Sequence, residues 1–522
     1  MGVFFNAIGR MSNQHVDVLI VGAGLSGIGA AHHLQTSCPQ KTYTILEGRA
    51  SSGGTWDLFR YPGIRSDSDM YTLGYSFRPW TGDNAIADGA SILDYVRDTA
   101  REAGIDKKIR FNHRVKRAAW STPEARWTVD VERGPDRELT RFTCSFLFMC
   151  TGYYDYEQGY TPEFAGVSSF KGRIVHPQKW TSDIDYANKR VIVIGSGATA
   201  VTLVPALAKT AAHVTMLQRS PTYVVARPAQ DPLAGKLRER FSAQTAYELT
   251  RWKNVLLGMI FYRLSRSRPE RMKKLFLAGV RQALGPDYDV ATHFTPRYQP
   301  WDQRVCLVPD GDLFTTIRSG QASVVTDHIE TFTEKGIKLR SGAELEADLI
   351  ITATGLNLNV LGDLSISVDG VPVVSNEKLT YKGMMWNDVP NMATAIGYTN
   401  ASWTLKCDLT CEYVCRLLQH MDETGLRQCT PRTHGENIEL DDWIDFNSSY
   451  VLRSLDKFPK QGKRTPWRLH QNYARDLLAL RFGAVVDEAM EFSNPAPGVA
   501  DKQPARRGLV RDAFRALLGD AP

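Results

Sequence analysis

The chain has 522 residues, of which 43% are hydrophobic and 23% charged, and its formal net charge is +6. This length and apolar content predict a folded protein of two to four domains, and they exclude collagen, a coiled coil, a disulfide-stabilised miniprotein and a disordered chain. The small positive charge suits anionic cofactors but does not indicate a nucleic-acid-binding protein.

The N-terminal residues MGVFFNAIGR lack the longer apolar stretch of a signal peptide. The most apolar segment, Val255 to Phe261, is far shorter than the roughly 20 residues of a membrane span. The eight cysteines form no CxxC pair, and Cys407, Cys411 and Cys415 recur every fourth residue, which predicts one buried helical face. We therefore expect a cytoplasmic protein without a metal site.

The first predicted unit, residues 15–47, is a strand, a glycine turn, a helix and a second strand. HVDVLIV enters the turn at Gly22, Gly24 and Gly27, and TYTILE ends at Glu47. In this arrangement the glycines allow a tight turn, close approach of a pyrophosphate, and close packing of helix on strand. A carboxylate that ends the second strand can accept hydrogen bonds from a ribose 2′-OH. The unit predicts a dinucleotide site.

The following loop, residues 53–67, concentrates residues that suit a ligand site. Its glycines permit close backbone approach, Trp56 offers a flat apolar wall, and Pro62-Gly63 sets a turn. The same loop carries two arginines and two aspartates. These features favour a binding site over a packed core.

A second unit repeats the first with one chemical change. Its strand RVIVI enters a glycine turn, and the next strand, HVTMLQ, ends at Arg219 and Ser220 instead of a carboxylate. A guanidinium suits a 2′-phosphate, which predicts FAD at the first turn and NADPH at the second. The alternative for Arg219 is a solvated surface residue. The second turn consists of Gly195, Ser196, Gly197, Ala198, Thr199 and Ala200.

Two further continuous apolar strands, CSFLFMCTG and ADLIITATG, predict crossings between two nucleotide-binding domains. We predict an α/β fold of two Rossmann-like domains with a helical insertion. The FAD domain is discontinuous, residues 11–155 and 350–495, and PNMATAIGYTNASW (390–403) with the helix after it closes over the flavin. The NADPH domain is 156–349, with a helical insert at about 225–298, and 496–522 is a tail.

The helical insert is basic, with RWKNVLLGMIFYRLSRSRPERMKKLF at its centre. One interpretation is a subdomain with a solvated basic face. The other is a lipid-facing surface near a substrate entrance, which leaves contact with a membrane surface open.

Two fingerprints give the chain its family resemblance. GGxWxxxxYPGxxxD spans Gly53 to Asp67, and FxGxxxHxxxW spans Phe170 to Trp180. Both resemble the flavin-dependent Baeyer–Villiger monooxygenases. IGSGATAVTLVP, PWDQRVCLVPDGDLF and YTNASWTLK are most similar to the ethionamide-activating type, over residues 14–495.

The resemblance implies a role for individual residues. Arg304 becomes the active-site arginine, Asp67 the carboxylate beside it, and Val115 a backbone contact of the adenine. Gln303 stands where many members have a lysine, which leaves Arg219 to supply most of the selectivity for NADPH. The FAD site would include Ser26, Glu47, Gly54, Thr55, Trp56 and Asp67, and NADPH would be held by Arg65, Ser66, the second turn, Arg219 and Ser220.

The implied activity is NADPH- and O2-dependent conversion of ketones to esters or lactones through a C4a-peroxyflavin, with oxidation of sulfides and thioamides. A fixed arginine would stabilise the anionic species formed in such a site. We expect a structural role for His176 in the second fingerprint. The alternatives are a flavin-dependent NAD(P)H dehydrogenase or reductase and a flavin-binding protein without activity. The sequence leaves the substrate and the oligomeric state open.

Overall fold

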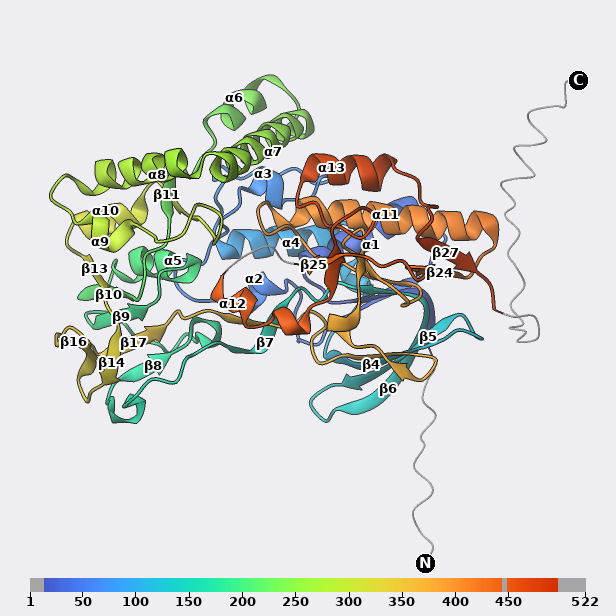
Figure 1. Ribbon diagram of the computed structural model, residues 1–522, viewed down its shortest axis with the longest axis horizontal. Helices are drawn as coiled ribbons and strands as arrows, with labels where there is room; N and C mark the ends of the chain where they lie inside the picture. The colour runs from blue at the N-terminus through green and yellow to red at the C-terminus, as the bar shows by residue number, and fades with distance from the viewer. Residues whose placement is uncertain (1–13, 444–447, 496–522) are drawn as a thin grey trace, which may run out of the picture.

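The computed structural model describes residues 14–443 and 448–495 and has the predicted α/β fold, built around two separate sheets (Figure 1). The N-terminal ten residues and the tail predicted at 496–522 lie outside the described residues. In Figure 1 the smaller sheet lies on the left and the larger on the right, with β7 (Tyr154–Gly159) between them.

The larger sheet has nine strands in the order β20-β19-β4-β5-β6-β1-β2-β3, with β23 paired to β6. β1 pairs in parallel with both β2 and β6, whereas β4, β5 and β6 form an antiparallel meander. The first predicted unit is thus confirmed as strand, turn, helix and strand. The strands are Gln14–Val21 (β1), Tyr43–Leu46 (β2), Ile109–Arg110 (β3), His113–Ser121 (β4), Arg126–Arg133 (β5), Glu138–Met149 (β6), Ser365–Val368 (β19), Val371–Pro372 (β20) and Met392–Thr394 (β23).

The smaller sheet has five parallel strands in the order β13-β10-β9-β17-β8. They are Arg173–Val175 (β8), Arg190–Ile194 (β9), His213–Gln218 (β10), Ala322–Thr326 (β13) and Leu349–Thr352 (β17). β17 is buried throughout, as its continuous apolar sequence predicts. The predicted domain limit between residues 349 and 350 falls inside this strand. The limits of the two domains stay a prediction.

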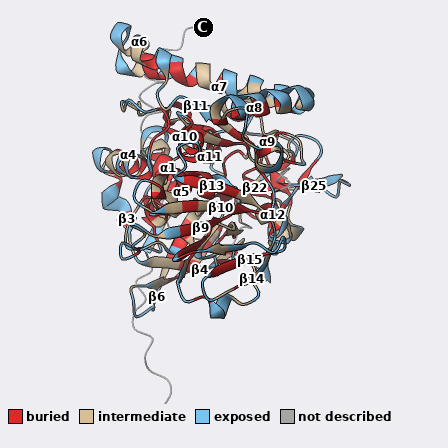
Figure 2. Cartoon of the chain, turned by 90° about the vertical axis from the view of Figure 1, so that its left-hand side faces the viewer, coloured by how far each residue is buried: buried red, intermediate tan, exposed pale blue. Residues whose placement is uncertain are grey.

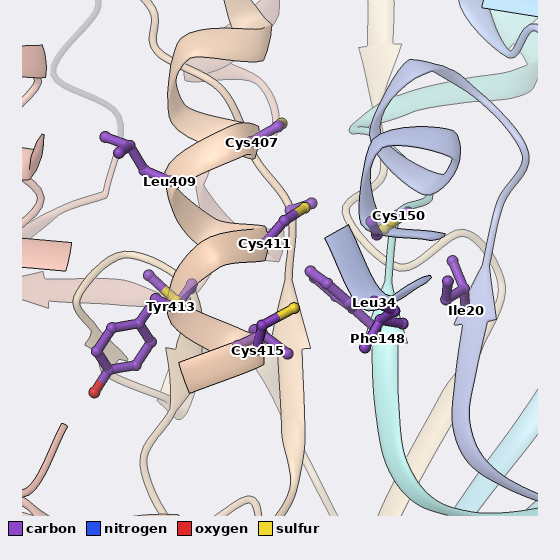
Figure 3. Packing of buried hydrophobic residues seen from close by; sticks show 14 of the residues in the cluster. Ile20, Leu34, Phe148, Cys150, Cys407, Leu409, Cys411, Tyr413 and Cys415 are labelled. Atoms are coloured by element: carbon purple, nitrogen blue, oxygen red, sulfur yellow. The ribbon is translucent and has the colours of Figure 1, made fainter. Parts of the chain in front are cut away.

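Helices α1 (Leu25–Ser37), α4 (Gly89–Glu102) and α11 (Trp403–Thr424) belong to the core of the larger sheet. The predicted cysteine face is confirmed: Cys407, Cys411 and Cys415 are buried on the side of α11 that packs against α1 (Figure 3). Cys38 donates a hydrogen bond from Sγ to the carbonyl of Cys415 at 3.6 Å. These thiols are therefore core residues.

The smaller sheet is accompanied by α5 (Ala198–Leu207) and α10 (Asp312–Arg318), and by the predicted helical insert. The insert consists of α6 (Pro232–Arg240), α7 (Ala243–Ser267), α8 (Pro269–Leu284) and α9 (Val290–Phe294). Helices α6 to α8 form an outer edge of the molecule, largely exposed in Figure 2. Within 14–443 and 448–495, no helix combines the length and apolar character of a membrane span.

Short elements complete the fold. The helices are Thr55–Leu58 (α2), Met70–Leu73 (α3), Ser449–Leu452 (α12) and Tyr473–Leu477 (α13). Paired strands are Val224–Arg227 (β11) with Cys306–Pro309 (β12), Leu356–Leu358 (β18) with β7, Thr380–Tyr381 (β21) with Met385–Trp386 (β22), Gln428–Pro431 (β24) with Met490–Ser493 (β27), and Leu440–Asp442 (β25) with Lys460–Gly462 (β26). Ile329–Phe332 (β14), Gly336–Leu339 (β15) and Glu344–Glu346 (β16) form a three-stranded sheet.

Candidate functional site

A cavity of about 1140 Å³ lies between the two sheets and is lined from both. Its wall includes the segments that follow the carboxyl ends of β1, β6, β9 and β17. Ligands of open α/β sheets bind at such carboxyl ends. One cavity therefore brings together the two glycine turns, which are 173 residues apart in the sequence.

The first glycine turn tolerates no side chain at two positions. A Cβ on Gly22, whose φ is +106°, would lie 2.5 Å from the carbonyl oxygen of Cys150. A Cβ on Gly27 would lie 1.9 Å from the carbonyl oxygen of Gly22. Gly27 does not line the cavity; it allows α1 to pack against the turn, which is the role expected of the third glycine.

The second glycine of the turn faces the 53–67 loop across a narrow backbone gap. A Cβ on Gly24 would lie 3.4 Å from the Cα of Gly54, and a Cβ on Gly54 would lie 3.0 Å from the Cα of Gly24. Gly24 is also the N-cap of α1, and it has no side chain that could accept hydrogen bonds from the first amides of the helix. A backbone cradle at a helix N-terminus fits the pyrophosphate of a dinucleotide.

Glu47 lies at the end of β2 and lines this part of the cavity. Its carboxylate accepts hydrogen bonds from the amides of Ala23 at 2.8 Å and Arg49 at 3.0 Å. Burial raises the pKa of Glu47, and the two amides oppose that shift. The carboxylate is therefore fixed beside the turn, where we predict the ribose of the first dinucleotide.

Asp57 holds the 53–67 loop in place, a role that sequence analysis missed. Its side chain is 1% exposed and accepts hydrogen bonds from Arg49, Arg60 and Arg97 at 2.6 to 2.8 Å and from Ser51 at 2.6 Å. Burial disfavours the charged form, but Ser51 and the three guanidinium groups outweigh it and lower the pKa of Asp57. Only the excess of arginines near this loop could have signalled the role.

The second glycine turn repeats the geometry of the first. A Cβ on Gly195, with φ of +137°, would lie 2.3 Å from the carbonyl oxygen of Ala353, and Gly197 begins α5 without a side-chain cap. Ala200 is fully buried, so the third position accepts a methyl group. Arg219 is exposed at the cavity wall, and no ion pair joins it to another described residue. This cation is available to a ligand.

Arg304 and Asp67 form an ion pair that bridges the two halves of the cavity. Asp67 comes from the 53–67 loop and Arg304 precedes β12; each side chain is 32% exposed and lines the cavity. Asp67 raises the pKa of Arg304 well above its ordinary value, against the opposing effect of burial. The guanidinium is therefore a permanent cation. Tyr153 and Tyr154 contribute to its electrostatic environment and line the same cavity.

A second ion pair lies beside the first. Arg65 donates to Asp312, at the start of α10, at 2.5 and 3.3 Å. Ser66 is buried, and its hydroxyl accepts a hydrogen bond from the amide of Ser68. Arg65 and Ser66 both line the cavity, so the predicted contact with NADPH would add to these bonds.

The segment 390–403 closes one wall of the cavity. Trp403, the first residue of α11, donates from Nε1 to Ser26 Oγ at 2.8 Å, and its ring lies 5.1 Å from that of Tyr153. Ser26 is in the first turn of α1. The segment thus lies beside the first glycine turn, and its closure over a flavin stays a prediction.

His176 lies outside the cavity wall. Its Nε2 lies 3.1 Å from the carbonyl of Gly355 and its Nδ1 accepts from the amide of Gln178 at 3.2 Å. Gly355 follows β17, so the imidazole fixes the crossing between the two halves. This contact supports the structural role predicted for the second fingerprint.

Apart from Gly27 and Ala200, every predicted site residue lines the cavity. Tyr153, Tyr154 and Tyr450 line it as well, although no motif marked them, and so does Trp403, the last residue of the 390–403 segment. Tyr153 and Tyr154 lie in the segment that follows the carboxyl end of the buried strand β6, and this place in the sequence is a usable signal. The predicted residues of the cavity wall are Gly22, Gly24, Ser26, Glu47, Gly54, Thr55, Trp56, Arg65, Ser66, Asp67, Val115, Gly195, Ser196, Gly197, Ala198, Thr199, Arg219, Ser220 and Arg304.

Comparisons with known proteins agree with this architecture. Residues 74–254 match a family model described as flavin-binding monooxygenase-like, and residues 20–84 match an NAD(P)-binding Rossmann-like domain. The chain is 56% identical over 486 residues to the FAD-containing monooxygenase EthA of Mycobacterium tuberculosis, an alignment that covers 93% of this chain and 99% of EthA.

Solved structures match the whole fold. A steroid monooxygenase bound to NADP has a TM-score of 0.73 at 22% identity and covers 92% of this chain and 100% of its own. OTEMO in complex with FAD and NADP has a TM-score of 0.67 at 25% identity and covers 82% of this chain and 88% of its own. The paired-sheet architecture is therefore shared with OTEMO, whose structure contains both FAD and NADP.

Proposed function

The chain belongs to the family of FAD-containing flavin-binding monooxygenases, and on this premise we propose that it binds FAD and NADPH and inserts oxygen beside a ketone carbonyl. Ketone, O2, NADPH and a proton give ester or lactone, NADP⁺ and water. We include sulfides and thioamides among its substrates, each of which gains one oxygen atom at sulfur.

The two backbone cradles fit the two cofactors. Gly22, Gly24 and Gly54 would hold the pyrophosphate of FAD and Glu47 its ribose, because the first amides of α1 have no capping side chain and the positive φ of Gly22 and Gly54 disfavours other residues there. The second turn would hold NADPH, with Arg219 at the 2′-phosphate. When bound, FAD accepts hydride from NADPH and activates O2.

The Arg304–Asp67 ion pair is the observation that carries the proposal. A cation fixed by a carboxylate stabilises negative charge as it develops on a substrate carbonyl oxygen, and it needs no reorganisation to do so. Tyr153 and Trp403 contribute aromatic walls to the same cavity, which limits the access of water. This arrangement supports the proposal that a neutral ketone binds beside the cation.

The test compares the amounts of NADPH and O2 that are consumed with the amount of ester that is formed. Purified protein loaded with FAD should consume equal amounts of NADPH and O2 when an aliphatic methyl ketone is added, and form the same amount of ester. A flavin-dependent dehydrogenase or reductase would oxidise NADPH without ester. The disulfide-reductase form of that alternative needs a redox-active cysteine pair, whereas all eight cysteines are free and buried. Oxidation of NADPH without oxygen uptake would disprove the proposal.

A further inference from the structure

The helical insert carries an unusual share of the exposed apolar surface. Nine of the eighteen exposed large hydrophobic side chains in the described chain lie between residues 233 and 275. Five of them, spaced by three or four residues, form a stripe along the outward side of α7. Soluble monomers rarely expose contiguous apolar patches of this kind without a function. The α7 stripe consists of Leu249, Trp252, Leu256, Ile260 and Leu264.

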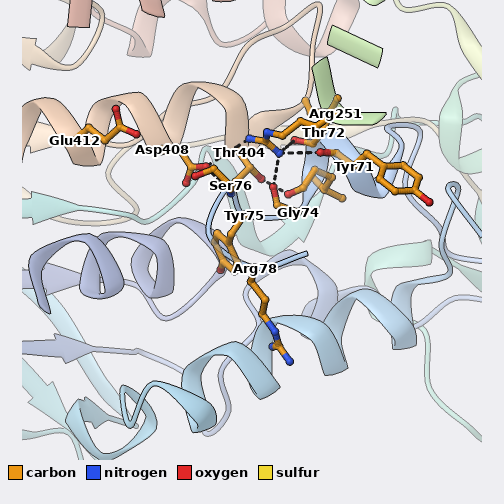
Figure 4. Close-up of polar contacts among 12 residues, drawn as sticks. Tyr71, Thr72, Gly74, Tyr75, Ser76, Arg78, Arg251, Thr404, Asp408 and Glu412 are labelled. Carbon is orange, nitrogen blue, oxygen red and sulfur yellow. Dashed lines mark hydrogen bonds and ion pairs between the residues drawn. The ribbon is translucent and has the colours of Figure 1, made fainter. Parts of the chain in front are cut away.

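The opposite side of α7 is buried and is anchored by a charged residue, which fixes the rotation of the helix. Arg251 is 6% exposed and donates from Nη1 to the carbonyls of Tyr71 and Gly74, both at 2.8 Å, while Nη2 lies 3.5 Å from Asp408 of α11 (Figure 4). Turning the stripe inward would leave a buried charge and several carbonyls unpaired. The apolar stripe is therefore held toward the outside of the molecule.

The same helices concentrate positive charge. Residues 232–284 contain twelve Lys and Arg but three Asp and Glu, whereas the whole chain has a net charge of +6, so the remainder of the chain is net negative. Arg263, Arg268, Arg271 and Lys274 are exposed around the junction of α7 and α8. Among the residues that the structure describes, no carboxylate forms an ion pair with these four. They are free to meet an anionic surface.

We propose that α7 and α8 dock the protein on an anionic lipid surface. The α7 stripe would enter the boundary between headgroups and acyl chains, and the cations of the α7–α8 junction would meet lipid phosphates. A membrane offers an apolar layer beneath a plane of negative charge, which complements both features. A second copy of this chain would instead oppose one basic face to another, so like charges would repel.

This docking surface is distinct from the cavity. None of the described residues that line the cavity belongs to α6, α7, α8 or α9. The predicted placement of these helices at a substrate entrance is therefore not supported by the lining. Docking leaves the cavity wall unchanged, and the inference stands independently of the proposed chemistry.

The experiment is sedimentation of the full-length, FAD-loaded protein with lipid vesicles. The protein should bind vesicles of phosphatidylcholine with phosphatidylglycerol, bind pure phosphatidylcholine more weakly, and lose the difference as salt is raised. The double variant Leu256→Ser/Ile260→Ser should reduce the partition coefficient between vesicle and water by about tenfold or more, because each substitution removes apolar side-chain surface that the lipid would bury. Arg263→Gln/Arg271→Gln should reduce the preference for phosphatidylglycerol.

The matched control is Leu139→Ser/Val371→Ser, which removes two exposed apolar side chains from the larger sheet, 63% and 67% exposed. It should bind as the wild type does, and FAD content and NADPH oxidation in solution should be equal in every variant. Failure of the wild type to sediment with either vesicle would overturn the proposal. So would equal binding by the α7 variant and the control. A dimer in ultracentrifugation that Leu256→Ser/Ile260→Ser converts to a monomer, without vesicle binding, would assign the surface to a second copy instead.

Discussion

Single residues of the cavity divide into groups that act on ligands and groups that hold the backbone. Arg304 is of the first kind, because it lines the cavity, where Asp67 is its only ion-pair partner among the described residues. Replacing Arg304 with alanine should slow ester formation by about 10²- to 10³-fold, as for the loss of a preorganised oxyanion donor. Reduction of the flavin by NADPH should continue. Stopped-flow reduction and product analysis measure the two steps separately.

The pH dependence of the same reaction is a sharper check. Asp67 raises the pKa of Arg304 well above its ordinary value, so the guanidinium stays charged across the working range of the enzyme. No pKa in the pH–rate profile of ester formation should therefore belong to Arg304, and any inflection of the wild-type profile should stay at the same pH in Arg304→Lys. A limb that shifts in Arg304→Lys would contradict a permanent cation. Arg173→Ala, which removes an exposed ion pair with Asp183, should leave the rate unchanged.

Arg219 decides whether the second site distinguishes two nicotinamide cofactors. It is exposed at the cavity wall, where a guanidinium meets a 2′-phosphate with paired donors. Arg219→Gln should raise the KM for NADPH about tenfold or more, the value of a charge-assisted hydrogen bond, and change the KM for NADH little. An equal change in the KM for NADPH and for NADH would show that Arg219 is a solvated surface residue.

Asp57 is of the second kind, since it does not line the cavity itself and binds three arginines, of which Arg49 does line it. Asp57→Asn should lower the free energy of unfolding by about 2–3 kcal/mol near neutral pH, because the arginines remain partly exposed and keep some solvation. The folded-state pKa of Asp57 is lowered, so its stabilisation is present above the unfolded pKa and disappears as pH falls through the folded pKa.

Denaturant unfolding at a series of pH values measures this effect. The gap between wild type and Asp57→Asn should be full near neutral pH and narrow below about pH 4, the ordinary pKa of an aspartate. Asp98→Asn, which removes an exposed ion pair with Arg101, is the control and should change stability by less than about 1 kcal/mol. A gap that persists unchanged into acid would refute the assignment.

At the scale of elements, helix α7 is anchored by a buried arginine. Arg251 joins it to α3 and α11 through carbonyls of Tyr71 and Gly74 and the carboxylate of Asp408. Arg251→Leu should cost about 3–5 kcal/mol in the free energy of unfolding, because the partners stay buried without a donor. Arg266→Leu removes an exposed partner of Asp302 and should cost less than about 1 kcal/mol. Equal losses in calorimetry would contradict the anchoring role.

The sequence predicted the elements that local chemistry determines. Both glycine turns, the buried strands β6 and β17, and the cysteine face of α11 follow from residue type and spacing. The contacts of Arg251 could not be predicted, because nothing in RWKNVLLGMIFYRLSRSRPERMKK separates it from exposed neighbours such as Arg263. Tyr450 reaches the cavity from a distant part of the chain, and no motif precedes it. Long-range packing, and not local pattern, decides these positions.

At the scale of the whole molecule, one short segment carries two ion pairs that join the two halves of the cavity. Residues 304–312 carry both Arg304 and Asp312, and these side chains pair with Asp67 and Arg65 of the 53–67 loop. The loop that lines the predicted FAD site is thereby tied to the half that contains the predicted NADPH site. Because Asp312 does not itself reach the reacting atoms in this arrangement, it is a positioning residue.

Breaking the Arg65–Asp312 ion pair should disturb the relative position of the two halves of the cavity more than the structure of either half. An ion pair of this partial exposure contributes about 1 kcal/mol, so Asp312→Asn should raise the KM for NADPH several-fold and raise the fraction of NADPH that ends as hydrogen peroxide instead of ester. FAD content should stay unchanged. Asp183→Asn, which breaks an exposed pair with Arg173 in the smaller-sheet half, serves as the matched control. If Asp312→Asn forms ester and peroxide in the wild-type ratio, the relative position of the halves does not depend on this pair.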